Sequence, residues 1–281
     1  MGTNSALDLS QGCILRSDST TNGISSRVVI CGDGSKVFWP SSYTNTGTLS
    51  WKGLTGTVIT NLTIASGGIL THEGPGLAES DKLIATIIGD LTIDIGGAIW
   101  LRGRGYFAQQ GPGAGLSNFN TGGHGGEGGY TPGFYTPGST YGSITNPVNW
   151  GSGSSAYFGG GTLLLTVGGT LTVNGDIRAG GTDSLGNSGG AAGGTLNIRA
   201  AKLAGSGVIS AVGGSGGGFG YAGGGGGRIA MVLTNDSDTA FSSFLDNTRL
   251  IANGGLYNYP LSENGAAGTV YLKATNNVYG H

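Results

Sequence analysis

The chain has 281 residues, of which 62 are glycine and only 10% are charged. Disordered chains are usually rich in charge and poor in β-branched residues, whereas this sequence contains many short runs of Val, Ile, Leu and Thr, so we expect it to fold. Thirteen basic and fifteen acidic residues give a net charge of −2 without a basic tract, which argues against a nucleic-acid partner. No apolar run approaches the ~18 residues that a membrane span needs, so no membrane insertion is expected.

Residues 1–54 are predicted to form an N-terminal β extension. Short runs such as SRVVICG and KVFW have the composition of strands. A strand from this region could complete the final coil of a second subunit, and such a head-to-tail contact would build a homo-oligomer or a filament. Cys13 and Cys31 lie 18 residues apart, and the sequence is compatible with a disulfide between them or with two free thiols.

A repeat occupies residues 55–281. LTI occurs at 62–64 and 91–93, the stretches 161–181 and 194–214 match each other 33 residues apart, and further units begin at Gly227 and Gly268. Each unit reads as a strand, a glycine turn, a second strand and a glycine-rich excursion, with apolar and polar residues alternating. Because one unit cannot bury its apolar face alone, we predict an all-β, right-handed parallel β-helix or β-solenoid of ~6–8 coils. An antiparallel sandwich or barrel is the alternative.

The glycine excursions are predicted to be ordered. The stretch 213–228 contains eleven glycines in sixteen residues and recurs at the same phase as 180–194, whereas a linker would not repeat once per coil. Glycine there permits positive φ angles and close backbone packing. We expect the excursions to lie side by side as extended threefold helices of the polyglycine II type. No amphipathic helix that could cap either end of the stack is evident.

The long excursion 106–160 is the candidate binding region. It holds ten of the 23 aromatic residues and a single charged residue, Glu127. Aromatic residues on glycine-rich loops offer large contact area at low entropic cost, which suits glycan or receptor binding. The alternative is that they pack the excursion onto the β-helix. Arg102 and Arg104 are expected to pair with Glu127 or to meet an anionic ligand. The candidate ligand-binding residues are Tyr106, Phe107, Tyr130, Phe134, Tyr135, Tyr141, Trp150 and Tyr157.

Catalytic and metal-binding patterns are weak, so neither an enzyme nor a cofactor is predicted. Carbohydrate-active enzymes need carboxylates clustered on one face, and the only candidates are Asp90 with Asp94 and Asp176 with Arg178. We interpret these as solvated charges. Thr-x-Thr pairs of the kind found on ice-binding solenoids do not recur at one phase in successive units.

The order of blocks LTIDIGGAIWLRGRGY, GGHGGEGG, LTVGGTLTVNGDIRAGG, GGGGGRIAMVL and GAAGTVYLK resembles a glycine-rich β-helix module of large bacterial surface and extracellular proteins. The resemblance covers about residues 55–275 and implies a non-catalytic structural or adhesive role outside the cell. The glycine tracts are more weakly similar to the tip adhesins of phage tail fibres. We therefore expect a surface module or filament subunit. A glycan- or receptor-binding adhesin using 106–160 is the alternative, and a carbohydrate-active enzyme is the third reading.

Overall fold

The computed structural model describes residues 60–115, 120–130, 137–218, 221–246, 248–257, 263–277 and Gly280, together with the backbone of short strands between Leu7 and Ile59. Within this part of the chain nearly all regular structure is strand, and the strands pair in parallel. This confirms the all-β prediction and excludes the antiparallel sandwich or barrel for the described strands. Cys13 and Cys31 lie outside the described residues.

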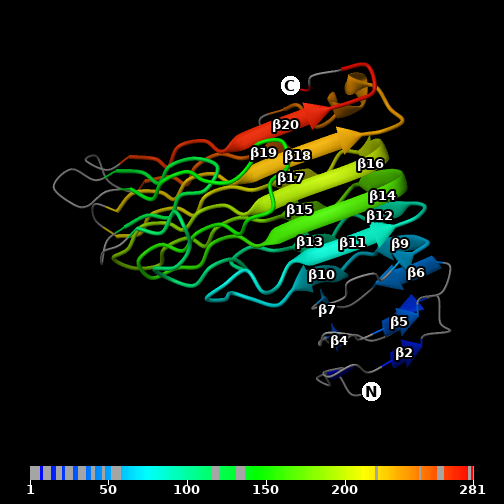
Figure 1. Ribbon diagram of the computed structural model, residues 1–281, viewed down its shortest axis with the longest axis horizontal. Coiled ribbons are helices and arrows are strands. Elements are labelled where there is room, and N and C mark those ends of the chain that lie inside the picture. The colour runs from blue at the N-terminus through cyan, green and yellow to red at the C-terminus, as the bar shows by residue number, and fades with distance from the viewer. Residues whose placement is uncertain are drawn as a thin grey trace.

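Two large parallel sheets are built up strand by strand from the N-terminal to the C-terminal end of the stack (Figure 1). The first contains, in spatial order, β1 (Leu7–Asp8), β4 (Val28–Ile30), β7 (Thr48–Trp51), β10 (Ile69–His72), β13 (Ala98–Trp100), β15 (Asp176–Arg178), β17 (Val208–Ser210) and β19 (Leu250–Ile251). The second contains β3 (Thr21–Asn22), β6 (Ser42–Asn45), β9 (Asn61–Ile64), β12 (Leu91–Ile93), β14 (Thr162–Val173), β16 (Thr195–Gly205), β18 (Arg228–Leu233) and β20 (Thr269–Lys273). In the same sheet β11 (Leu83–Ile87) pairs with β14 on one side and with β8 (Val58–Ile59) on the other. A separate pair joins β2 (Ile14–Arg16) to β5 (Lys36–Phe38).

The register of these strands follows the sequence repeat. Thr162 of β14 pairs with Thr195, Thr195 with Arg228 and Arg228 with Thr269, each one residue after the glycine that was predicted to open a unit. Strands β6 and β7 pair with β9 and β10, so strands from the N-terminal extension continue the same two sheets. The predicted repeat is therefore confirmed from β9 to β20.

The core lies between the sheets and is built from files of aliphatic side chains. In-register parallel pairing places corresponding residues of successive units side by side in a row, or file, such as the buried residues Ile99, Ile177 and Ile209. Strand β11 shows strict alternation, with Leu83, Ala85 and Ile87 buried and the residues between them exposed. This is the period of a strand with one face in the core.

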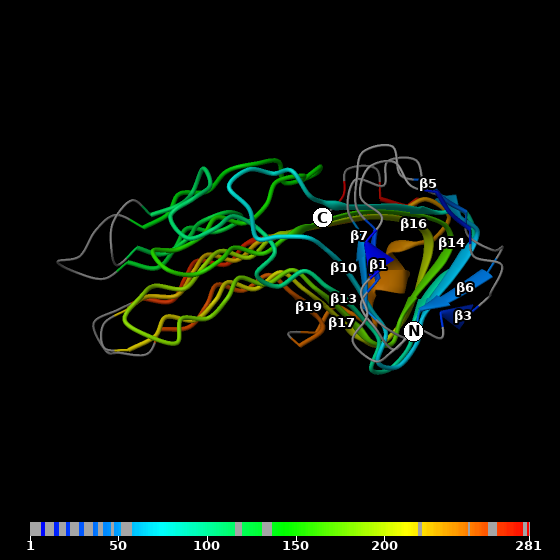
Figure 2. The ribbon, with the colours of Figure 1, turned by 90° about the horizontal axis from the view of Figure 1, so that it is seen from below.

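One end of the core is filled by a short 3-10 helix, η1 (Asp238–Phe241). Phe241 and Phe244 are 2% and 0% exposed and belong to the main hydrophobic cluster. Figure 2 shows this segment inside the space that the sheets surround. Phe241 ends this helix and Phe244 lies in the turn that follows it, so a short apolar segment fills this end of the core without a long amphipathic helix among the described residues.

Four glycine segments connect the sheets: 101–161, 179–194, 211–227 and 252–268, here called the first to fourth. They extend together away from the strands, side by side (Figure 2). Their hydrogen bonds repeat every three residues. In the second segment, Gly190, Ala191 and Ala192 N–H donate to Ala222, Thr182 and Ser152 O (3.1, 3.3 and 3.0 Å), and the cycle then continues with Gly193 to Gly225 O (2.9 Å) and Gly194 to Ala179 O (2.6 Å).

This pattern gives each glycine segment hydrogen-bonded neighbours in three directions. Successive N–H groups of a helix with three residues per turn point about 120° apart, so each reaches a different neighbour. The glycine stretch around Gly224 behaves likewise, since the N–H groups of Gly224, Gly225 and Gly226 donate to three different segments. The prediction that the excursions are ordered is confirmed for the described residues.

Close packing, and not backbone conformation, requires glycine here. Of the described glycines in the third segment only Gly218 has a positive φ (61°), so the expected role of positive φ was largely wrong. A Cβ at Gly190 would instead fall far inside van der Waals contact with Gly214 O, and one at Gly224 would meet Ala191 O in the same way. A side chain would therefore push neighbouring segments apart.

Single threonines recur along the second sheet. Thr44, Thr63, Thr92 and Thr172 are register partners on β6, β9, β12 and β14, so single threonines do recur at one phase. The Thr-x-Thr pairs that were sought in the sequence are not the repeating unit. The adjacent outward positions hold Asn61, Asp90 and Thr170, which are linked by hydrogen bonds from Asp90 N to Asn61 Oδ1 (2.9 Å) and from Thr170 N to Asp90 Oδ1 (2.7 Å).

Two alanine substitutions in the second glycine segment test whether close packing, and not the loss of a glycine as such, affects stability. Gly190→Ala should lower the free energy of unfolding by about 1–3 kcal/mol, because its Cβ has no space. Gly186→Ala should change it by less than about 0.5 kcal/mol, since its Cβ would meet only Tyr157 Oη at 3.8 Å. Chemical denaturation of both variants measures this. Equal losses would show that the segment is not close-packed as described.

Candidate functional site

The candidate site begins with a file of side chains at the ends of three neighbouring strands. Trp100, Arg178 and Ser210 are the last residues of β13, β15 and β17, and they are register partners. The preceding residues in the same strands face the core, so alternation turns this file outward. Trp100 is 37% exposed, which is unusual for an indole on a rigid strand.

The chain continues in register for several residues beyond the strand ends. Leu101 N–H donates to Arg178 O (2.7 Å), Ala179 N–H to Ser210 O (2.8 Å) and Gly103 N–H to Gly180 O (3.0 Å). Leu101 and Ala179 point into the core, both 0% exposed. A second outward file therefore follows two residues after the first, comprising Arg102, Gly180, Val212 and Asn253.

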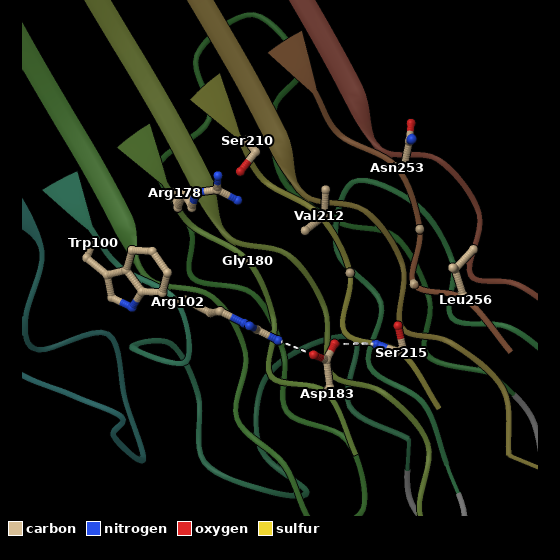
Figure 3. Close-up of a pocket in the computed structure, with 13 residues that line it drawn as sticks. Trp100, Arg102, Arg178, Gly180, Asp183, Ser210, Val212, Ser215, Asn253 and Leu256 are labelled. Carbon is tan, nitrogen blue, oxygen red and sulfur yellow. Dashed lines mark hydrogen bonds and ion pairs between the residues drawn. The ribbon is translucent and has the colours of Figure 1, made fainter. Parts of the chain in front are cut away.

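These two files line a half-open pocket of about 390 Å³ where the strands pass into the glycine segments (Figure 3). Ligand pockets commonly have volumes of ~300–1,000 Å³. The pocket combines an exposed aromatic ring with a few charged and polar groups. Its lining consists of Trp100, Arg102, Arg178, Gly180, Asp183, Ser210, Val212, Gly213, Ser215, Asn253, Gly254, Gly255 and Leu256.

Arg102 and Asp183 form an ion pair across the pocket wall (Figure 3). Arg102 Nε also donates to Gly181 O (3.2 Å), and the second carboxylate oxygen of Asp183 accepts from Ser215 N–H (2.8 Å). The pair thus joins the first, second and third glycine segments. The expected partner of Arg102, Glu127, was wrong. Arg104 lies nearby and donates from Nη1 to Gly74 O (2.9 Å).

Arg178 is held less completely. Its Nη2 donates to Asp176 Oδ1 (3.1 Å), and the two side chains are 38% and 35% exposed. The Nε atom is buried and has no hydrogen-bond partner among the described residues. Asp176 and Arg178 were interpreted from the sequence as solvated charges. The structure shows an exposed ion pair whose arginine also lines the pocket.

The long aromatic excursion mostly packs inward. Trp150 is 0% exposed, its ring makes an edge contact with Tyr106 (centroids 5.5 Å apart), and Tyr141 Oη donates to its carbonyl oxygen (2.5 Å). Glu79 accepts from Trp150 N–H (3.0 Å) and from Tyr106 Oη (3.2 Å). Burial, with Glu79 adding to it, raises the pKa of Tyr106 to about 12. Tyr106, Tyr141 and Trp150 therefore form a satellite core, as the alternative reading of the sequence had it.

The other predicted residues are spread over the excursion. Phe107 is 37% exposed and makes an edge contact with Phe158 (5.6 Å), and Tyr130 is 40% exposed. Tyr157 Oη accepts from Leu185 N–H (2.8 Å). Phe134 and Tyr135 lie outside the described residues.

Two histidines are buried beneath the excursion and stay neutral. His72 Nε2 accepts from Thr162 N–H (3.2 Å), and its ring stacks on Trp150. His124 Nδ1 donates to Gly193 O (2.8 Å), whereas its Nε2 is buried without a partner among the described residues. Desolvation by burial lowers the pKa of each histidine to about 4.

Other kinds of site find less support in the described part of the chain. No group of three or more His, Cys, Asp or Glu side chains is placed to hold a metal ion there. Asp90, which was considered with Asp94 as a carboxylate pair and interpreted as a solvated charge, accepts a backbone hydrogen bond from Thr170 N–H. No helix of the described residues has the length and apolarity to cross a bilayer.

Sequence reasoning missed this pocket. The short blocks IWLRG (99–103), IRAGG (177–181) and ISAVG (209–213) share an apolar residue at the first and third positions and a glycine at the fifth. Aligning them would have brought Trp100, Arg178 and Ser210 into one file. The signal was hidden because residues 104–160 separate the first block from the unit that begins at Gly161.

Comparisons of the chain with protein-family models, with curated protein sequences and with solved structures gave no match.

The buried histidines predict acid sensitivity. Their folded-state pKa of about 4 lies below the ordinary value of 6.5, so the unfolded chain binds more protons between these limits. The free energy of unfolding should therefore keep its full value above pH 6.5. It should fall as the pH drops from 6.5 towards 4, by about 1–2 kcal/mol per histidine at pH 5.

Denaturation of the wild type and His124→Gln at pH 7 and pH 5 measures this loss. The glutamine variant should lose about half as much free energy of unfolding between the two pH values as the wild type. Parallel losses in both proteins would show that His124 is protonated in the folded state.

Proposed function

We propose that this protein is a non-catalytic adhesive module that acts outside the cell or on a virion and binds saccharide chains in the pocket at the ends of β13, β15 and β17. The proposal rests on one observation: an exposed tryptophan lies in register with an arginine and a serine on three neighbouring, hydrogen-bonded strands. The apolar C–H face of a sugar ring packs on an indole, and its hydroxyl groups need neighbouring donors and acceptors.

The scaffold suits such a role. We take the two parallel sheets to be sides of a β-solenoid, and the glycine segments to form a layer of polyglycine II type beside it. The repeating register and the three-residue period of hydrogen bonding support both assignments. A site on continuously hydrogen-bonded backbone is held more firmly than one on loops, so little order has to be gained when a ligand binds.

Matched variants can show whether a saccharide binds in the pocket or on the aromatic excursion. Trp100→Ala should abolish binding on a glycan array, and Phe107→Ala, at an aromatic residue with the same 37% exposure, should leave it unchanged. Gly180→Val should also block binding, because a Cβ at Gly180 meets only Val212 and Arg102 atoms at 3.4 Å or more and points a side chain into the pocket.

Unchanged melting temperatures of the three variants would confirm that binding, and not folding, is affected. If Phe107→Ala abolished binding while Trp100→Ala and Gly180→Val retained it, the saccharide site would lie on the aromatic excursion instead.

A second candidate function is end-to-end self-association, and Val270 on β20 favours it. Its register partner Ile229 is 0% exposed in the core, yet Val270, which faces the same way, is 37% exposed. Among the described residues β20 pairs only with β18. An interior position left exposed beside an unpaired strand edge is a natural contact for another sheet edge.

Sedimentation velocity over a range of concentrations tests self-association. The wild type should form larger species as concentration rises, and Val270→Lys should remain monomeric because a charge would occupy the contact. Ile95→Lys, at a turn residue that is 80% exposed, is the matched control and should behave as the wild type. A wild type that is monomeric throughout would exclude this second function.

A further inference from the structure

We infer that the pocket selects acidic saccharides, those carrying a carboxylate group, and that Arg178 is the residue that contacts this group. The inference rests on the proposed saccharide-binding function and adds the chemical class of the ligand. It follows from how the charged groups of the pocket are engaged.

The lining contains two guanidinium groups, Arg102 and Arg178, and one carboxylate, Asp183. Arg102 is committed to the structure, because its ion pair with Asp183 is completed by hydrogen bonds to Gly181 O and from Ser215 N–H. Removing that pair would loosen three glycine segments. The positive charge that remains available to a ligand is therefore that of Arg178.

Arg178 has donors to spare. A guanidinium carries five N–H donors in a planar fork that fits a carboxylate through two parallel bonds. Here one bond is made, from Nη2 to Asp176 at 3.1 Å, and both partners are more than a third exposed. Such exposed pairs are weak, so a ligand carboxylate can displace or share the contact with Asp176. Asp176 itself is not part of the lining.

The neighbours of Arg178 fix what else the ligand needs. Trp100 lies on the adjacent strand on one side and Ser210 on the adjacent strand on the other. Paired strands lie about 4.8 Å apart, so a ring stacked on Trp100 has its substituents within reach of Arg178. Figure 3 shows the Arg178 guanidinium beside Ser210, with Asn253 and Leu256 across the pocket. A carboxylate-bearing sugar with its ring on Trp100 meets both requirements.

The test compares sugars that differ only in charge. An array of sialylated and uronic acid-containing oligosaccharides is prepared alongside the methyl ester of each, and affinities of the binders are measured by titration calorimetry. The wild type should bind the acids about 10- to 100-fold more tightly than the esters, the range expected for a hydrogen-bonded charge pair. Added salt should narrow this ratio.

Three variants locate the effect. Arg178→Gln should reduce the acid-to-ester ratio to near one, and Arg178→Lys, which keeps the charge but loses the fork, should give an intermediate ratio. Asp176→Asn should raise acid affinity because it removes the competing carboxylate. Equal binding of acids and esters, or a ratio unaffected by Arg178→Gln, would overturn this inference alone. If no saccharide, acid, ester or neutral, bound to the wild type, the proposed function itself would fail.

Discussion

The fold depends on one constraint, which is that each backbone N–H and C=O of a unit must find its partner in the next unit. Parallel strands cannot satisfy these groups within a unit, because their neighbours lie one repeat away in the sequence. The register Thr162, Thr195, Arg228 and Thr269 shows the constraint at work in the second sheet. Once this register is set, corresponding residues of successive units lie side by side in files on both faces of the sheet.

The glycine segments extend the same constraint beyond the sheets. Here the chain no longer has strand geometry, yet Gly190 and Gly193 both donate to the third segment, three residues apart in donor and acceptor alike. Backbone groups are satisfied in three directions instead of two, at positions where the close approach of neighbouring segments leaves no space for a Cβ. A glycine content this high would indicate disorder in most proteins. Here glycine is what allows the segments to pack, because Cβ atoms would occupy the space between hydrogen-bonded neighbours.

Sequence alone predicted the parts of the molecule that repeat. The apolar positions of β14, β16 and β18 and the start of each unit were evident from alternation and spacing. The parts that occur once were missed. Phe241 and Phe244 fill the core from a four-residue 3-10 helix and the turn after it, which are too short to show a helical period. Arg102 pairs with Asp183, 81 residues away, and not with Glu127, the single charged residue of the excursion 106–160. The pocket was missed for a related reason, since Trp100 and Arg178 belong to adjacent strands that are separated by the first glycine segment.

If the pocket binds saccharides as proposed, different residues provide its stability and its recognition of the ligand. Inward residues such as Leu101 and Ala179 fill the core, and the backbone between them is fixed by hydrogen bonds to the next strand. The outward residues of the same stretch, Trp100, Arg178 and Ser210, rest on this backbone, and the exposed side chains among them contribute little to it. Outward side chains on such strands can therefore be substituted one at a time without a change in the backbone beneath them. Under the proposed function, the exposed arginine and tryptophan serve the ligand, because the fold does not require either side chain to be exposed.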